Sequence, residues 1–208
     1  MFQYIWNNAP VLMRLMLEHM QIVLISVSLG VLVSLVITFI IYTLPFSKEP
    51  LMIVLRILYT IPSLAFFAFL IPFLGIGFKN AVVVLSVYTL FFLVNSFLNG
   101  LYHVDEAVLD AAKAVGYTPR ERFISIQLPL ALPDIVTGIR LASVSTIGIT
   151  CIAYTIGAGG LGSILFEGMR QSAYPKILTG SFLVIVLNIF TNTILLKVSQ
   201  MITKKLYT

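Results

Sequence analysis

Residues 109–133, "LDAAKAVGYTPRERFISIQLPLALP", form the one long stretch of the chain that does not suit a lipid environment. The stretch combines charged residues, a glycine and prolines. The chain around it has 208 residues, of which 59% are hydrophobic and only 10% are charged. Soluble domains carry about 25% charged residues. The composition therefore indicates an integral membrane protein that is interrupted near its middle by a loop outside the bilayer.

Apolar runs on both sides of this loop predict five transmembrane helices. A helix needs roughly 20 mostly apolar residues to cross a hydrocarbon core of about 30 Å, and the runs lack the apolar-polar alternation of β-barrel strands. We expect an all-α integral membrane protein with a single transmembrane domain over residues 1–208 and a cytoplasmic loop at 105–133. The predicted spans are about 20–44, 55–74, 80–101, 136–157 and 177–198.

Two of the predicted spans contain helix-breaking residues. Pro62 and Pro72 are expected to kink or end the second span. A glycine-rich segment is expected to end the helix of the fourth span near Thr155. Before the first span, residues 10–19 fit either a short interfacial helix or simply the beginning of that span, with Arg14 and Glu18 paired one turn apart.

The distribution of basic residues predicts the orientation. With five spans, the loops after the first, third and fifth spans share one side of the membrane. That side carries Lys48, Arg56, Lys113, Arg120, Arg122, Arg140, Lys197, Lys204 and Lys205, against four basic residues on the other side. Because Lys and Arg accumulate on the cytoplasmic side, we expect the N-terminus outside and the C-terminus in the cytoplasm. The basic charge therefore needs no nucleic-acid partner.

The first half of the cytoplasmic loop predicts one short helix. Asp105 is suited to cap it, and strong helix formers follow over 105–115. Gly116 stands where a left-handed residue would end such a helix. We therefore expect a helix followed by a glycine elbow.

The second half of the loop predicts another short helix. In the sequence "TPRE", Thr118 and Glu121 match a capping box with proline at the first helical position. This helix is expected to cover about 119–128. Pro129 and Pro133 are then expected to stop it and to redirect the chain into the fourth span.

The loop resembles the cytoplasmic loop of the membrane subunits of ABC importers. That family has the pattern E-A-A, three residues, G, nine residues, I-x-L-P, and this chain matches it from Asp110 to Pro129 with Asp in place of Glu. The resemblance implies a type I importer permease fold, known as MetI-like, and a coupling helix that docks on an ATP-hydrolysing subunit. The implied coupling residues are Asp110, Ala111, Ala112, Gly116, Arg120, Glu121, Phe123, Ile126, Leu128 and Pro129.

Other segments resemble the permeases for glycine betaine, carnitine and choline. They are "TIPSLAFFAFLIPFLGIG" (60–77), "GIRLASVSTIGI" (138–149) and "IGAGGLG" (156–162). Methionine importer subunits are similar in size and also carry a glycine-rich segment after the fourth span. The resemblance therefore implies a pathway for a quaternary ammonium compatible solute, with a methionine or other amino-acid importer as the alternative and a non-transport membrane scaffold as a more remote one.

The resemblance also implies partners and a location. The partners are ABC ATPase subunits, a second identical or similar permease, an extracellular substrate-binding protein and membrane lipid. The location is the bacterial cytoplasmic membrane, which the chain crosses several times. ATP and Mg²⁺ would bind to the partner ATPase, so this chain is expected to bind no cofactor.

Motifs for catalysis are missing from the sequence. It has no G-x-x-x-x-G-K-[ST] nucleotide loop, its two histidines are far apart, and Cys151 is its single cysteine. We therefore expect neither an enzyme nor a metal site. The glycines of 157–162 are spaced like a dinucleotide-binding motif but follow a membrane span instead of a strand. A flexible external loop or a support for a gate is the expected role.

Polar residues on one face of the fourth span are candidates for the translocation pathway. They recur at intervals of three and four residues, as one helix face requires. Hydroxyl and small residues also pack helices together in membranes, and both roles stay open. The candidates are Ser143, Thr146, Thr150 and Tyr154, with Tyr88 and Asn95 in the third span.

Overall fold

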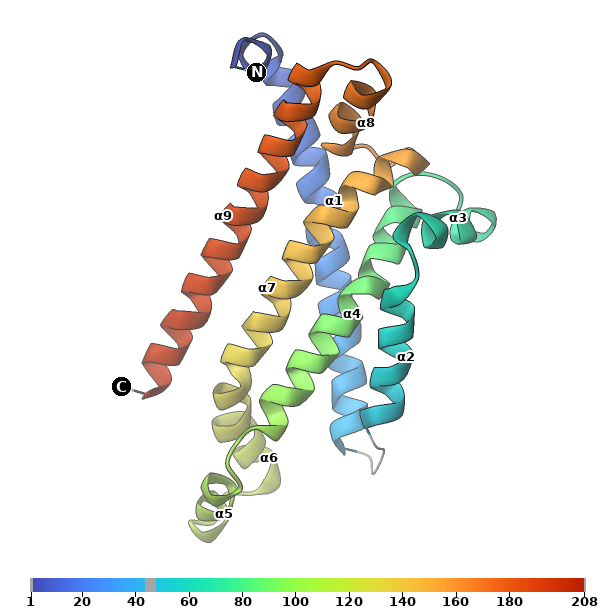
Figure 1. Cartoon of the computed structure of the whole chain (residues 1–208). Coiled ribbons are helices and arrows are strands. Elements are labelled where there is room, and N and C mark those ends of the chain that lie inside the picture. Colours follow the sequence, from blue (N-terminus) through green and yellow to red (C-terminus); the bar gives the residue numbers. More distant parts are fainter. Residues whose placement is uncertain (1, 44–47, 208) are drawn as a thin grey trace.

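The computed structural model of the protein describes residues 2–43 and 48–207, and the secondary structure of this part of the chain is helical (Figure 1). Leu44, the last residue of the first predicted span, lies outside the described residues. The elements are α1 (Phe2–Thr43), α2 (Lys48–Thr60), α3 (Ser63–Leu74), α4 (Phe78–Tyr102), α5 (Glu106–Ala114), α6 (Pro119–Arg122), a π-helical turn (Phe123–Gln127), α7 (Leu128–Ala153), a 3₁₀ turn (Tyr154–Ile156), α8 (Gly162–Arg170) and α9 (Tyr174–Tyr207).

The helices α4 and α7 form the centre of a bundle. Each packs against the other and against α1, while α9 packs on α7 and α2 packs on α4. Figure 1 shows α5 and α6 at one end of the bundle, and α3, α8 and the N-terminus at the other. We call these the α5 end and the α8 end. Residues that are far apart in the sequence therefore meet at both ends of the bundle.

The first helix is continuous from Phe2 to Thr43. Residues 10–19 are therefore the beginning of the helix that contains the first span, which was one of the two expected arrangements. The predicted pairing within them is confirmed, because Arg14 Nε lies 3.5 Å from Glu18 Oε1.

Five spans are reached only if α2 and α3 together count as one. Within residues 2–43 and 48–207, four helical stretches are each long and apolar enough to cross a membrane, and α2 and α3 meet the same requirement as a pair bent by 95°. The second span predicted at 55–74 is therefore broken near Pro62, as expected for a proline that kinks or ends it. The break falls at Ile61 and Pro62, because the residue before a proline is disfavoured in the helical region. Pro72 lies inside α3 without ending it.

Two side chains of α4 bond to backbone groups near this break. The Tyr88 hydroxyl donates to the carbonyl oxygen of Ile61 at 2.5 Å. The Asn80 amide donates to the carbonyl oxygens of Phe67 and Gly75 at 3.1 and 2.9 Å. Backbone groups within a bilayer need such internal partners because lipid offers none. Side chains of α4 therefore hold α3 in its bent position.

The expected stop at Pro129 and Pro133 was wrong. The chain stays helical from Pro119 to Ile156. In the π-helical turn the amide of Leu128 bonds to the carbonyl oxygen of Phe123, five residues back. This wider turn restarts the hydrogen-bond register, so Pro129 falls in the first turn of α7, where its missing N–H costs least. The fourth span therefore begins inside the cytoplasmic loop predicted at 105–133.

Glycines allow α4 and α7 to approach closely. A Cβ atom on Gly138 would lie 2.6 Å from Ser96 Cβ, and one on Gly100 would lie 3.0 Å from the carbonyl oxygen of Ala131. Small residues at helix contacts are typical of membrane bundles, where close backbone approach supplies much of the attraction. The central contact of the fold therefore depends on the absence of side chains at these two positions.

We expect Gly138→Val to destabilise the chain by roughly 1–3 kcal/mol, because the added methyl groups overpack the contact with α4. Gly148→Val is the matched control, since a Cβ on Gly148 of the same helix meets nothing within 4 Å. Thermal unfolding of the purified protein in detergent measures the difference. Equal melting temperatures for the two variants would contradict this account of the contact.

Candidate functional site

The first half of the predicted coupling loop has the expected structure. Asp105 Oδ1 accepts a hydrogen bond from the amide of Ala107 at 2.9 Å and so caps α5. Gly116 has a φ of 98°, in the left-handed region. The amide of Tyr117 bonds to the carbonyl oxygen of Ala112 at 3.1 Å, which is the bonding pattern of a Schellman motif. The predicted helix end and the glycine elbow are confirmed.

The capping box after the elbow is also confirmed. The amide of Thr118 donates to Glu121 Oε2 at 2.9 Å, and the amide of Glu121 donates to Thr118 Oγ1 at 3.3 Å. Pro119 occupies the first helical position. Both helices of the loop are thus fixed by bonds between neighbours in the sequence. The caps of both helices therefore depend on residues within the loop.

The predicted coupling residues lie at different depths. Asp110, Ala111, Gly116, Arg120 and Glu121 are exposed. Ala112 is buried, and the remainder are half-buried: Phe123, Ile126, Leu128 and Pro129.

Exposed apolar side chains around the elbow were missed by the sequence analysis. Val115 is 79% exposed, Ile124 is 50% exposed and Tyr117 is 42% exposed. Contiguous exposed apolar groups mark surfaces that other proteins cover. The signal was present in the sequence, since Val115 and Tyr117 adjoin Gly116 and Ile124 follows in the second half of the same loop. The tip of the loop therefore offers a mixed apolar and charged surface for a partner.

A second missed residue connects the loop to the bundle. Gln127 is the unspecified position of the I-x-L-P pattern, and its side chain is buried. Its Oε1 accepts from the Tyr42 hydroxyl of α1 at 2.8 Å, and its Nε2 donates to the carbonyl oxygen of Leu101 in α4 at 3.0 Å. The centroid of the Phe123 ring lies 5.8 Å from the centroid of the Tyr42 ring. The base of the loop is therefore joined to two membrane helices.

The predicted hydroxyl stripe of the fourth span points into the chain. Ser143, Thr146 and Thr150 are buried. Each hydroxyl donates to the carbonyl oxygen four residues earlier, at 2.7–2.8 Å. Tyr88 is buried as well. The alternative role that the sequence left open, packing between helices, fits these surroundings.

A different face of α7 is open. Leu141 is 42% exposed, and Gly148 is exposed on the same face. On one side of this face the hydroxyl of Ser145 lies 3.2 Å from that of Tyr59 in α2. On the other side Arg140 Nη1 donates to Asn192 Oδ1 in α9 at 3.4 Å. We call this surface the open face of α7.

The other two pathway candidates lie on neighbouring elements. Asn95 is exposed on α4. Tyr154 lies at the α8 end, where its hydroxyl accepts from Arg170 Nη2 at 3.2 Å. A charged residue within an apolar run was the signal for the open face, because a charge in a membrane helix needs a polar environment. Ser143, Thr146 and Thr150 lie on the opposite face of α7, and their role in a pathway stays a prediction.

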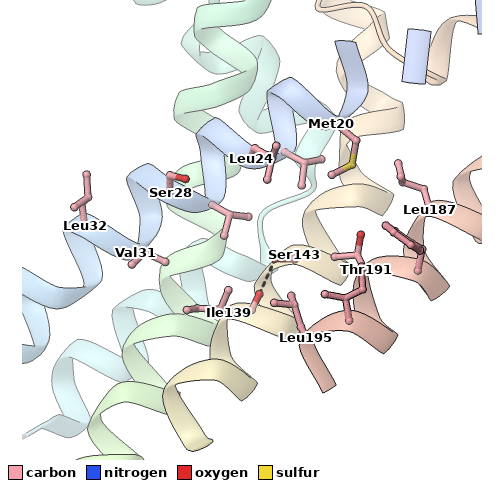
Figure 2. Close-up of a pocket in the computed structure, with 14 residues that line it drawn as sticks. Met20, Leu24, Ser28, Val31, Leu32, Ile139, Ser143, Leu187, Thr191 and Leu195 are labelled. Carbon is pink, nitrogen blue, oxygen red and sulfur yellow. Dashed lines mark hydrogen bonds between the residues drawn. The ribbon is translucent and has the colours of Figure 1, made fainter. Parts of the chain in front are cut away.

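A large groove between α1, α7 and α9 is almost wholly apolar (Figure 2). Its volume is about 680 Å³. Figure 2 shows Ser143 on the α7 side with its hydroxyl bonded to its own helix, between aliphatic side chains such as Leu24 and Leu187. A charged or zwitterionic solute would lose its hydration there without finding new partners. The groove therefore does not suit a polar cargo.

The glycine-rich segment, expected to be either a flexible external loop or a support for a gate, is bonded to α1. The amides of Gly160 and Leu161 bond to the side chains of Glu18 and His19 in α1, each at 3.3 Å. The helix α8, which the sequence analysis did not predict, follows directly.

Across residues 2–43 and 48–207, the structure brings no three His, Cys, Asp or Glu side chains together in a way that could hold a metal ion.

Comparison with known proteins agrees with this geometry. Residues 30–204 match the family model described as "binding-protein-dependent transport system inner membrane component". The chain is 34% identical over 193 residues to the choline transport system permease protein OpuBB of Bacillus subtilis (strain 168). This match covers 93% of this chain and 89% of the relative. It is 38% identical over 146 residues to the ergothioneine transport permease/ergothioneine binding protein EgtU of Helicobacter pylori (strain G27). That match covers 70% of this chain, which spans only 26% of the relative.

Solved structures agree on the fold. The chain superposes on a subunit of the MetNI methionine ABC transporter in an inward-facing conformation with a TM-score of 0.83 at 22% identity, covering 94% of this chain and 98% of the other. The predicted MetI-like fold is thus confirmed, and the protein crosses the bacterial cytoplasmic membrane several times. The chain belongs to the binding-protein-dependent transport system inner membrane component family, the membrane permease subunits of ABC importers.

Proposed function

We propose that this permease forms, with a second permease, the pathway for a compatible solute that carries a quaternary ammonium group. The observation that carries the proposal is the similarity to OpuBB along 93% of the chain. Choline and ergothioneine, the solutes in the names of the two relatives, both contain a trimethylammonium group. The methionine transporter is similar in fold at 22% identity, which says nothing about cargo. An amino-acid cargo therefore has weaker support.

The transport work would be driven by a separate ATPase subunit that binds ATP and Mg²⁺. Its docking surface would be the tip of the loop, where Val115, Tyr117 and Ile124 are exposed around Gly116. Movement of the docked subunit would reach the bundle through Gln127, which bonds to both α1 and α4. The chain itself would act as a transport subunit and not as an enzyme.

The cargo would travel along the open face of α7. Polar groups on and beside that face are Arg140, Ser145, Tyr59 and Asn95, and an exposed glycine lies between them. Ser143, Thr146 and Thr150 would reach cargo only in a conformation that opens their packed contacts. An extracellular binding protein would hold the solute tightly, so the permease needs only weak contacts that allow fast release.

The cargo is tested on the extracellular binding protein that works with this permease. We expect calorimetry to detect binding of glycine betaine, carnitine or choline, since aromatic rings hold quaternary ammonium groups through cation–π attraction. Uptake of the same solute should depend on the permease. Tight methionine binding without any response to these three solutes would refute the proposal.

We infer that the α5 end of the bundle is cytoplasmic and that the α8 end is outside, because nine of the thirteen Lys and Arg residues fall on the side of the α5 end. In a Cys151→Ser background, a cysteine replacing the exposed Lys113 of α5 should react with a membrane-impermeant thiol reagent only from the cytosol. A cysteine replacing the exposed Lys79 should react only from outside. Reversed labelling would contradict the orientation.

Gly116→Val should leave the protein in the membrane but abolish coupled uptake. Its φ of 98° costs a residue with a Cβ about 1–2 kcal/mol, and the relaxed elbow would no longer present the loop to the ATPase. Gly75→Val is the matched control, since Gly75 also has a positive φ and open space around it but lies at the other end of the bundle. Uptake, ATPase copurification and ATP hydrolysis in proteoliposomes measure the effect. Normal coupling in Gly116→Val would mean that the loop is only a connector.

A further inference from the structure

His19 joins three segments at the α8 end. The side chain is fully buried in α1. Its Nδ1 lies 3.3 Å from the amide nitrogen of Leu161, and its Nε2 lies 3.0 Å from the carbonyl oxygen of Ile147 in α7. Because an amide N–H only donates, Nδ1 must accept and Nε2–H must donate. The ring is therefore neutral, with one tautomer selected by its two partners.

Glu18 binds the neighbouring amide of the same loop. Its Oε2 accepts from the amide of Gly160 at 3.3 Å, while Arg14 Nε lies 3.5 Å from its Oε1. Two consecutive side chains of α1 thus hold two consecutive amides that are more than 140 residues away in the sequence.

The glycines of the segment are explained by this contact. A Cβ on Gly159 would lie 2.9 Å from Glu18 Oε2, and one on Gly160 would lie 3.1 Å from His19 Nδ1. Both residues also have a positive φ. At Gly162 a Cβ would collide with the carbonyl oxygen of Cys151 in α7. The motif therefore fits around Glu18 and His19, which we call, together with residues 159–161, the α1 latch.

The latch fixes the position of α8. This helix begins at Gly162, directly after the latched residues, and its other end packs closely on α9, where Glu167 Oε2 lies 3.7 Å from Lys176 Nζ. The turn before α4 joins the same region, because the amide of Gly77 bonds to the carbonyl oxygen of Ile156 at 2.7 Å. Met169 and Arg170 of α8 are exposed, and Arg170 donates to the Tyr154 hydroxyl at 3.2 Å.

We propose that Glu18 and His19 are positioning residues for transport: they hold α8 and its exposed surface where the extracellular binding protein delivers cargo. The inference rests on the proposed function and on the orientation with the α8 end outside. The glycine loop at residues 159–161 could not hold this shape alone, because glycine gives a backbone more freedom than any other residue. The two side chains of α1 supply the missing constraint.

The test uses the complete importer with its ATPase and binding protein in proteoliposomes. His19→Leu removes both bonds, and His19→Gln keeps one acceptor and one donor. His103→Gln is the control at the other, exposed histidine. We expect His19→Leu to raise the binding-protein concentration for half-maximal ATPase stimulation by about tenfold, the effect of losing a buried hydrogen-bonding partner. His19→Gln should restore most of the response, with assembly and basal ATP hydrolysis unchanged.

A second pair of variants separates positioning from folding. Gly160→Ala and Gly157→Ala both place a Cβ at a positive φ, but only the first faces His19, since a Cβ on Gly157 meets nothing within 4 Å. We expect Gly160→Ala to lose more of the stimulation of ATP hydrolysis by the binding protein than Gly157→Ala does.

Two results would overturn the inference: a His19→Leu importer that responds like His103→Gln, or equal responses of His19→Leu and His19→Gln. If His19→Leu fails to assemble, Gly160→Ala and Gly157→Ala are compared instead. Equal losses of ATPase stimulation in these two variants would then overturn the inference. Failure of the proposed function would instead show in the wild type, as a complex whose ATP hydrolysis ignores its binding protein.

Discussion

The structure depends on one constraint: within a bilayer, a backbone amide or carbonyl group must find its partner inside the protein. At several places where the helices are interrupted, a side chain from another element supplies that partner. Tyr88 serves the break between α2 and α3, Gln127 serves the end of α4, and His19 serves both α7 and the glycine loop. Together with Asn80 and Glu18, these three residues support irregular backbone near the two ends of the bundle.

The features that the sequence predicted well depend on neighbours in the chain. The capping of α5, the left-handed Gly116 and the capping box of Thr118 and Glu121 involve bonds over five residues or fewer. Their patterns are local and can be read without knowing the fold. The five apolar runs were also readable, because length and composition decide whether a helix can cross a bilayer.

The features that the sequence did not predict depend on distant contacts. The helix continues through Pro129 because the π-helical turn shifts its register, and that turn places Gln127 against α1 and α4. The hydroxyl groups of Thr146 and Thr150 could line a pathway or pack a core, and only the neighbouring helices decide between the two. The pairing of Glu18 and His19 with the glycine loop spans 142 residues. Periodicity carries no information about such pairs.

The continuous helix from Pro119 to Ile156 has a mechanical consequence. Its 38 residues span about 57 Å at 1.5 Å per residue, from the loop at the α5 end to the glycine segment at the α8 end. One of its close contacts with α4, at Gly138, lies near the middle of that length, and another joins Ala131 to Gly100. A rod held at its midpoint moves its two ends in opposite directions when it tilts. A tilt of this helix about its contacts with α4 would therefore widen one end of the face that it lines while narrowing the other.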